Sequence, residues 1–229
     1  MHVNIIAVPG VVPLDLVGPY EVFSRVPGWS VNLVAAELTP VVSDKGLAFL
    51  PDCTRKTAKP CGLLVIPGGA GADIAMLDET WLSFIRDHAQ QAQYVLGVCT
   101  GALLLGAAGL LKGKRAGSHW QARDLLALFD AIPSDERIVA DGKYYTSAGV
   151  TSGIDAALKV VADIEGEERA RIIQLAMEYA PAPPFGGGTP ITSPPEIVAR
   201  VREASAARRA ERERRVIEAA DRLKNDPTV

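Results

Sequence analysis

One of the three cysteines stands in a setting that suits a nucleophile. Cys99 follows the apolar run Tyr94–Val98, lies two positions from a glycine on either side, and precedes a second apolar run. This G-x-C-x-G pattern is the thiol counterpart of the G-x-S-x-G elbow, a tight turn between a strand and a helix. We expect such a turn to expose the sulfur at a helix N-terminus, where the macrodipole favours the thiolate. The alternative is a buried core cysteine, the commoner fate of a free thiol.

An acidic residue in an apolar segment is a candidate partner for this thiol. Asp15 lies in the segment 12–19, just past the carboxyl end of the first predicted strand. Burial and a neighbouring thiolate would raise the pKa of this carboxyl, which would let it act as a general acid or base near neutral pH. Asp15 is equally interpretable as a helix N-cap, and its position alone does not separate the two roles.

A glycine-rich turn and the residue after the cysteine are candidate donors to a developing negative charge. The turn at 67–71 follows a buried strand, and its glycines let backbone N–H groups come close to a ligand. We expect the N–H groups of Gly69 and Thr100 to act as these donors, although a plain turn is the alternative. The turn matches neither the dinucleotide fingerprint nor the Walker motif, which disfavours nucleotide binding.

The remaining histidines and cysteines give weaker signals. His119 follows Cys99 by twenty residues, and a histidine is the usual base for a thiol. No orienting acid follows it closely, so a supporting role is favoured for His119. The spacing of Cys53 and Cys61 matches no common zinc pattern, and both are interpreted as structural. These residues therefore give no reason to expect a metal site.

Composition limits the class of protein. The chain has 229 residues, of which 48% are hydrophobic, and a formal net charge of -3. These values indicate a globular protein with a full core and give no electrostatic reason for nucleic-acid binding. No apolar run is long enough for a membrane span or a signal peptide. Together with the odd number of cysteines, this predicts a cytoplasmic protein in a reducing compartment.

Strand and helix signals alternate along most of the chain, which predicts an α/β fold. Continuous apolar strands between helices indicate a doubly wound, mostly parallel sheet with helices on both faces. Sites in such sheets form at the carboxyl ends of the strands, where the segments 8–15, 67–71 and 99–101 all lie. The expected strands are 3–7, 29–36, 62–67, 94–98, 115–119, 137–140 and 144–148, and the expected helices are 14–26, 78–93, 100–111, 122–129, 153–166 and 167–179.

The C-terminal part has a different composition. We expect the α/β domain to cover residues 1–180, a Pro/Gly-rich connection to follow at 181–195, and one helix to occupy 196–229. Basic and acidic side chains nearly cancel in that helix, so it does not resemble a nucleic-acid arm. It either lies on its own domain or packs on a second subunit, and its thin apolar stripe favours neither.

Several of these segments together resemble the ThiJ/PfpI superfamily over about residues 3–179. The resemblance rests on the elbow, the Pro67-Gly68-Gly69 turn and the acidic loop 14–19. Further segments are similar to one branch of this superfamily, which contains isocyanide hydratases and the sensor domains of AraC-type regulators. The segments that indicate this branch are 106–116, 119–120 and 148–155, and 178–185 is similar to the hydratases. The 34 residues after Pro195 leave no room for the DNA-binding region of those regulators.

The resemblance implies a flavodoxin-like, class I glutamine-amidotransferase-like fold, a homodimer and an enzyme without a cofactor. It implies that Cys99 adds to an isocyanide to form a thioimidate, with Asp15 and Thr100 as further catalytic residues. His119 and Val150 would then contact the catalytic residues without touching the substrate. Two alternatives remain open: another cysteine enzyme of the superfamily, such as a glyoxalase-type enzyme, amidase or peptidase using His119, and a redox or stress sensor with an oxidisable Cys99.

Overall fold

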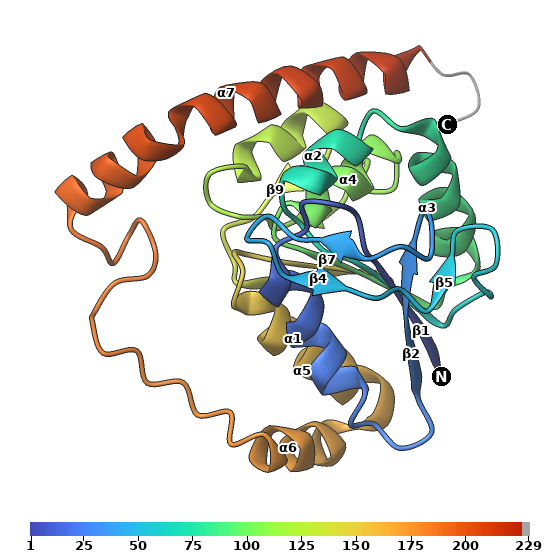
Figure 1. Ribbon diagram of the computed structural model, residues 1–229. Coiled ribbons are helices and arrows are strands. Elements are labelled where there is room, and N and C mark those ends of the chain that lie inside the picture. Colours follow the sequence, from blue (N-terminus) through green and yellow to red (C-terminus); the bar gives the residue numbers. More distant parts are fainter. Residues whose placement is uncertain (226–229) are drawn as a thin grey trace.

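A mostly parallel sheet forms the centre of the molecule (Figure 1). The computed structural model describes residues 1–225. The sheet has seven strands in the order β10-β11-β7-β6-β1-β2-β5, and only the edge strand β10 runs antiparallel to its neighbour. The strands are β1 (His2–Ile6), β2 (Ser30–Ala35), β5 (Cys53–Thr54), β6 (Leu63–Ile66), β7 (Tyr94–Val98), β10 (Ile138–Asp141) and β11 (Tyr144–Ser147). This arrangement confirms the predicted α/β class.

Helices cover both faces of the sheet because its central strands are apolar on both faces. All four residues of β6 are buried, and alternate ones belong to two separate core clusters. One face is covered by α1 (Pro13–Phe23), α5 (Ser152–Glu165) and α6 (Glu167–Ala176). The other is covered by α2 (Ala70–Ala75), α3 (Glu79–Gln91), α4 (Gly101–Ala107), the 3-10 helix η1 (Arg123–Phe129) and α7 (Pro195–Lys224).

The structure differs from the sequence-based expectation mainly in its short elements. A hairpin forms between β3 (Val41–Val42) and β4 (Ala48–Phe49), and β5 pairs with β2 at the sheet edge. The strand expected at 115–119 shortens to β8 (Arg115–Ala116), which pairs with β9 (Ile132–Pro133). The helix at 122–129 is of the 3-10 type, and α2 was not anticipated. Elements of two to seven residues are too short to show a clear period.

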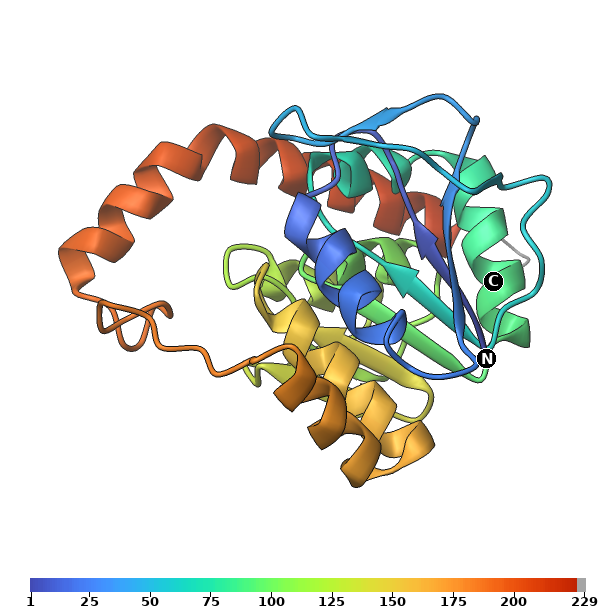
Figure 2. The same ribbon diagram turned by 60° about the horizontal axis from the view of Figure 1, so that its bottom comes forward.

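The long helix α7 crosses α2 and α4, and its first half extends beyond the rest of the molecule (Figures 1 and 2). Its buried residues lie only in its second half: Arg212, Val216, Ala219 and Ala220. In the first half, Ile197 and Val201 are 45% and 44% exposed. Within residues 1–225 no helix, α7 included, is both long and apolar enough to cross a bilayer.

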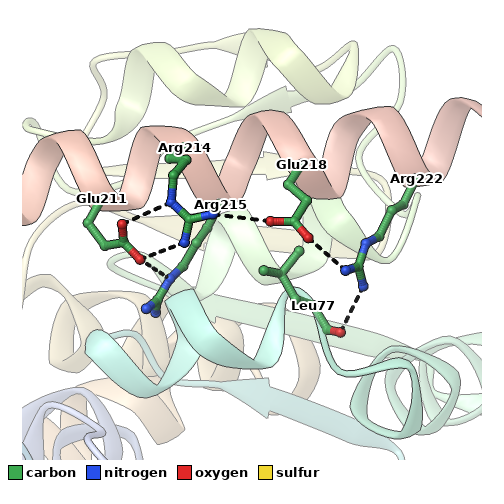
Figure 3. Close-up of polar contacts among 6 residues, drawn as sticks. All are labelled: Leu77, Glu211, Arg214, Arg215, Glu218 and Arg222. Carbon is green, nitrogen blue, oxygen red and sulfur yellow. Dashed lines mark hydrogen bonds and ion pairs between the residues drawn. The ribbon is translucent and has the colours of Figure 1, made fainter.

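Ion pairs stiffen the packed half of α7 (Figure 3). Arg222, one of the arginines in these pairs, also donates a hydrogen bond of 3.1 Å to the Leu77 carbonyl oxygen in the loop after α2. Such i,i+3 and i,i+4 pairs each stabilise an exposed helix by about 0.3–0.5 kcal/mol. The residues involved are Glu211, Arg214, Arg215, Glu218, Arg222 and, through its carbonyl, Leu77.

The elbow between β7 and α4 depends on the absence of a side chain at one glycine. A Cβ on Gly101 would lie 1.9 Å from the carbonyl oxygen of Ile66, the last residue of β6. A real Cβ does not come that close to a backbone atom, so α4 can start beside β6 only with glycine at this position. Gly97 similarly lies against the backbone of Ala102, with 3.2 Å between its ideal Cβ and that residue.

We therefore expect Gly101→Ala to lower the free energy of unfolding by about 1–3 kcal/mol, the usual cost of forcing atoms into a packed interior. Urea denaturation of wild type and variant measures this difference. Gly186→Ala is the control, because nothing lies within 4 Å of the added methyl group and the backbone there needs no positive φ. Equal losses in the two variants would contradict the close approach at Gly101.

Candidate active site

Three turns at the carboxyl ends of parallel strands meet at one edge of the sheet. The loop after β1 and the turn after β6 are joined by a β-bridge between Val11 and Gly69, and the Val12 N–H donates to the Gly68 carbonyl at 3.0 Å. The elbow after β7 is held against the end of β6 by Gly101. These contacts bring together three segments that the sequence had separated by about 50 and 30 residues, as expected for strand ends of one sheet.

Cys99 occupies the tip of the elbow in a left-handed backbone conformation, with φ of 56°. Such a conformation is uncommon outside glycine and concentrates at functional sites. The surrounding backbone holds it, since the Cys99 N–H donates to the Ser147 carbonyl at 3.2 Å and the Ser118 hydroxyl donates to the Cys99 carbonyl at 2.9 Å. Strand, turn and helix thus form the predicted tight turn with Cys99 at its tip.

The thiol itself is buried, which corrects the expectation of an exposed thiolate. Cys99 is only 4% exposed. Burial, and then the nearby Asp15 carboxyl, raise the pKa of Cys99 well above its ordinary value. The Thr100 N–H and the charge of Arg212 act in the opposite direction and lower that pKa, but they do not outweigh burial. A helix N-terminus therefore does not by itself produce a thiolate in so enclosed a place.

Asp15 lies beside the thiol and is fully buried. Its Oδ2 accepts a hydrogen bond from the Gly68 N–H at 3.1 Å, whereas its Oδ1 has no hydrogen-bond partner among the described residues. It is not the N-cap of α1, because Val12 occupies that position. Burial raises the pKa of Asp15 to about 7, although the Gly68 N–H and the Cys99 thiol both lower it. The carboxyl can therefore gain and lose a proton near neutral pH.

The expected backbone donors are partly engaged inside the protein. The Gly69 N–H donates to the Thr100 hydroxyl oxygen at 2.9 Å, so it reaches the site through that side chain and is not free in this arrangement. The Thr100 N–H interacts with the Cys99 sulfur. Gly68 must lack a side chain, because a Cβ there would lie 2.6 Å from the Thr100 nitrogen and 2.9 Å from Asp15 Oδ2.

His119 and Val150 lie around this centre without a hydrogen bond to the thiol among the described residues. The Gln121 N–H donates to His119 Nδ1 at 3.2 Å, and the imidazole lies against Gly149. Burial, followed by the charges of two arginines, lowers the pKa of His119 to about 4, so the ring is neutral at neutral pH. Val150 packs against the core cluster that contains Cys99. A supporting role for both residues stays a prediction.

The sequence analysis missed two charged residues that lie near the site. Arg212 of α7 and Asp73 of α2 form a buried ion pair, with 2.8 Å between Nε and Oδ1. The only local signal for Arg212 is its spacing, because it precedes the buried Val216 by four residues and so shares the packed face of α7. Nothing near Asp73 in the sequence indicates a partner 139 residues away.

The profile of the DJ-1/PfpI family matches residues 1–163. Isonitrile hydratase of Pseudomonas putida is 45% identical over 206 residues, which cover 90% of each chain. The HTH-type transcriptional regulator CdhR of Pseudomonas aeruginosa is 29% identical, over 65% of this chain and 44% of that one.

Solved structures show the same fold. A ThiJ/PfpI family protein from Pseudomonas syringae superposes with a TM-score of 0.90 at 40% identity, covering 96% of this chain and 90% of that one. DJ-1 of Toxoplasma gondii has a TM-score of 0.70 at 22% identity, covering 79% of this chain and 99% of its own, and so shares the fold alone. The P. syringae protein matches almost the whole chain, whereas the DJ-1 structure leaves about a fifth of it uncovered.

The buried carboxyl makes a prediction about pH and stability. From its ordinary pKa of 3.8 up to about 7, Asp15 is ionised in the unfolded chain but protonated in the folded one. The unfolded state then binds fewer protons, so this group makes the free energy of unfolding fall as pH rises, by up to about 1.4 kcal/mol per pH unit.

Asparagine at position 15 cannot ionise and removes this contribution. We expect the free energy of unfolding of Asp15→Asn to increase relative to that of wild type as the pH rises from 3.8 to about 7. Above that pH the difference between the two proteins should stay constant. Urea denaturation of both proteins across this pH range measures the difference. Parallel curves for wild type and variant would show that Asp15 ionises alike in both states.

Proposed function

This chain belongs to the DJ-1/PfpI family, and within that family we propose that it is an isonitrile hydratase, which adds water to an isocyanide to give an N-substituted formamide. The observation that carries the proposal is the buried pair of Cys99 and Asp15, in a chain 45% identical to such an enzyme over 90% of its length. The terminal carbon of an isocyanide accepts a nucleophile and then a proton. A thiol beside a carboxyl that titrates near neutral pH supplies both.

In the first proposed step, Cys99 adds to the isocyanide carbon. The sulfur forms a bond to that carbon, and the Asp15 carboxylate takes the thiol proton and delivers it to the same carbon, so that the carboxylate is regenerated. The product is a covalent thioimidate in which carbon holds hydrogen, nitrogen and the Cys99 sulfur. The unpartnered Oδ1 of Asp15 supports this role, because it is free to exchange a proton with the thiol and the substrate.

In the second proposed step, water releases the formamide. The Asp15 carboxylate takes a proton from the water, whose oxygen bonds to the thioimidate carbon, and passes that proton to the substrate nitrogen. The carbon–sulfur bond then breaks as the carbonyl forms, and the remaining hydroxyl proton passes through Asp15 to the sulfur. Thr100 suits the orientation of water or substrate, because its hydroxyl accepts from the Gly69 N–H and keeps its own hydrogen for donation. These steps use only side chains, backbone N–H groups and water.

Activity of the purified protein tests this proposal directly. We expect wild type to convert cyclohexyl isocyanide to the formamide and Cys99→Ala to lose this activity. Asp15→Asn should fold and lower kcat by about 10²–10⁴-fold, the usual contribution of a general acid or base. Formamide production is followed by chromatography.

Cys61→Ala is the matched control, because it removes another buried free thiol outside the site and should keep full activity. An equal rate in wild type and Cys99→Ala would refute the proposed mechanism. Turnover of a small aldehyde such as methylglyoxal that depends on His119 and tolerates Asp15→Asn would instead support a glyoxalase-type enzyme.

The same proposal includes a cytoplasmic homodimer. Three free cysteines suit a reducing compartment. The first half of α7 and the connection before it expose large apolar side chains on a segment that extends from the domain, as a dimer contact requires. These side chains are Phe185, Ile191, Ile197 and Val201, which are 84%, 85%, 45% and 44% exposed.

Light scattering tests the dimer. We expect wild type to have the mass of two chains, and a double variant with Ile197→Glu and Val201→Glu to have the mass of one. The packed half of α7 stays intact in this variant, so the domain should remain folded. Ala199→Glu, which adds a charge about half a turn away on an exposed position, is the control and should stay dimeric. A monomeric wild type would refute this contact.

A further inference from the structure

Arg212 is the one lysine or arginine in residues 1–225 that is buried, at 7% exposure. Charged side chains are almost never buried unless they are paired, because removing an ion from water costs several kcal/mol. The position of this charge therefore calls for a reason beyond packing.

The partner of Arg212 connects it to the site. Asp73 accepts a hydrogen bond from Arg212 Nε at 2.8 Å and is itself buried. Asp73 lies in the first turn of α2, and its N–H donates to the Gly69 carbonyl at 3.4 Å. The ion pair thus joins α7 to the turn whose N–H groups bind Asp15 and Thr100.

The packing of α7 places the guanidinium group firmly. The helix crosses α2 and α4, which are two of the three helices that begin at the turns of the site (Figure 1). The turns of α7 that follow Arg212 are packed on the domain through the buried residues Val216, Ala219 and Ala220. Arg222 adds a hydrogen bond to the Leu77 carbonyl at 3.1 Å (Figure 3). Arg212 is therefore held at the point where α7 meets α2.

The charge of Arg212 reaches the reacting groups. It lowers the pKa of both Cys99 and His119, which shows that the two side chains lie within its electrostatic range. Asp15 faces the thiol from α1 and raises the pKa of Cys99. Arg208, one turn earlier on α7, lowers the pKa of His119 and acts to lower that of Asp73.

We propose that Arg212 is a positioning residue of this active site, whose cation, fixed by Asp73, stabilises the negative charge on the Cys99 sulfur. A buried thiolate beside a carboxyl needs a counter-charge, and Arg212 supplies it from outside the region that the family profile matches. The C-terminal helix is then a part of the site. This inference rests on the proposed function only for the role of Cys99 as nucleophile.

The rate of Cys99 alkylation by iodoacetamide, measured across pH, reports the fraction of thiolate. Mass spectrometry of the Cys99 peptide separates it from the other two cysteines. The test variant combines Arg212→Met with Asp73→Asn, so that no uncompensated charge is left buried. The matched control is Asp73→Asn alone, which loses the same ion pair but keeps the cation. Circular dichroism checks that both fold.

We expect alkylation of the double variant near neutral pH to be slower than in wild type by up to about tenfold, with the pH midpoint shifted upward, because a nearby cation favours the ionised thiol and one pKa unit corresponds to a factor of ten. Asp73→Asn should keep the wild-type midpoint or lower it, and Arg212→Lys should keep it. An unchanged midpoint in the double variant, or equal shifts in the two Asp73 variants, would overturn the proposal.

This experiment does not depend on isocyanide turnover. If wild type hydrates no isocyanide, the proposed function fails, while the alkylation midpoints still decide the role of Arg212. If the enzyme is active and the midpoints do not move, the function stands and the role of Arg212 falls.

Discussion

The hydrogen bond from the Gly68 N–H to Asp15 Oδ2 is the contact on which the site depends. It forms only because three turns approach one another more closely than side chains would permit. Gly68 faces Thr100 and Asp15, and Gly101 faces the end of β6. Once these backbones are in contact, the positions of the thiol, the carboxyl and the hydroxyl follow with little freedom. The geometry is therefore a property of the sheet edge and not of flexible loops.

Close packing has an electrostatic cost that shapes the chemistry. Both acidic groups of the centre are buried, and burial raises the pKa of Asp15 and of Cys99. Two negative charges at this distance would be strongly unfavourable, so the pair keeps at least one proton and titrates as a unit. A shared proton is useful when the same atom must receive first a nucleophile and then a hydrogen. The site holds that proton in a place that bulk water does not reach.

Sequence patterns revealed the parts of the site that obey local rules. Cys99 and Gly69 were found because strand ends and glycine spacing are visible in a single segment, and Asp15 because an acid in an apolar run is unusual. The burial of the thiol was not visible, since it results from three segments packing together. The ion pair between Asp73 and Arg212 joins residues 139 apart, and no local pattern encodes such a contact. Short elements such as α2 and β5 were not predicted, because a helix of six residues or a strand of two is too short for its hydrophobic periodicity to be recognised.

Because the C-terminal helix is synthesised last, the proposed site, Arg212 included, is completed only at the end of translation. Residues 1–163 include every strand of the sheet and the whole elbow, whereas α7 is synthesised last. Domains generally begin to fold from the N-terminus during synthesis. The nascent protein is then expected to pass through a stage in which the thiol and the carboxyl are already assembled but the guanidinium group has not arrived. If Arg212 stabilises the thiolate as proposed, the thiol gains its full reactivity only when the last helix docks, and it is protected from stray electrophiles while the chain is incomplete.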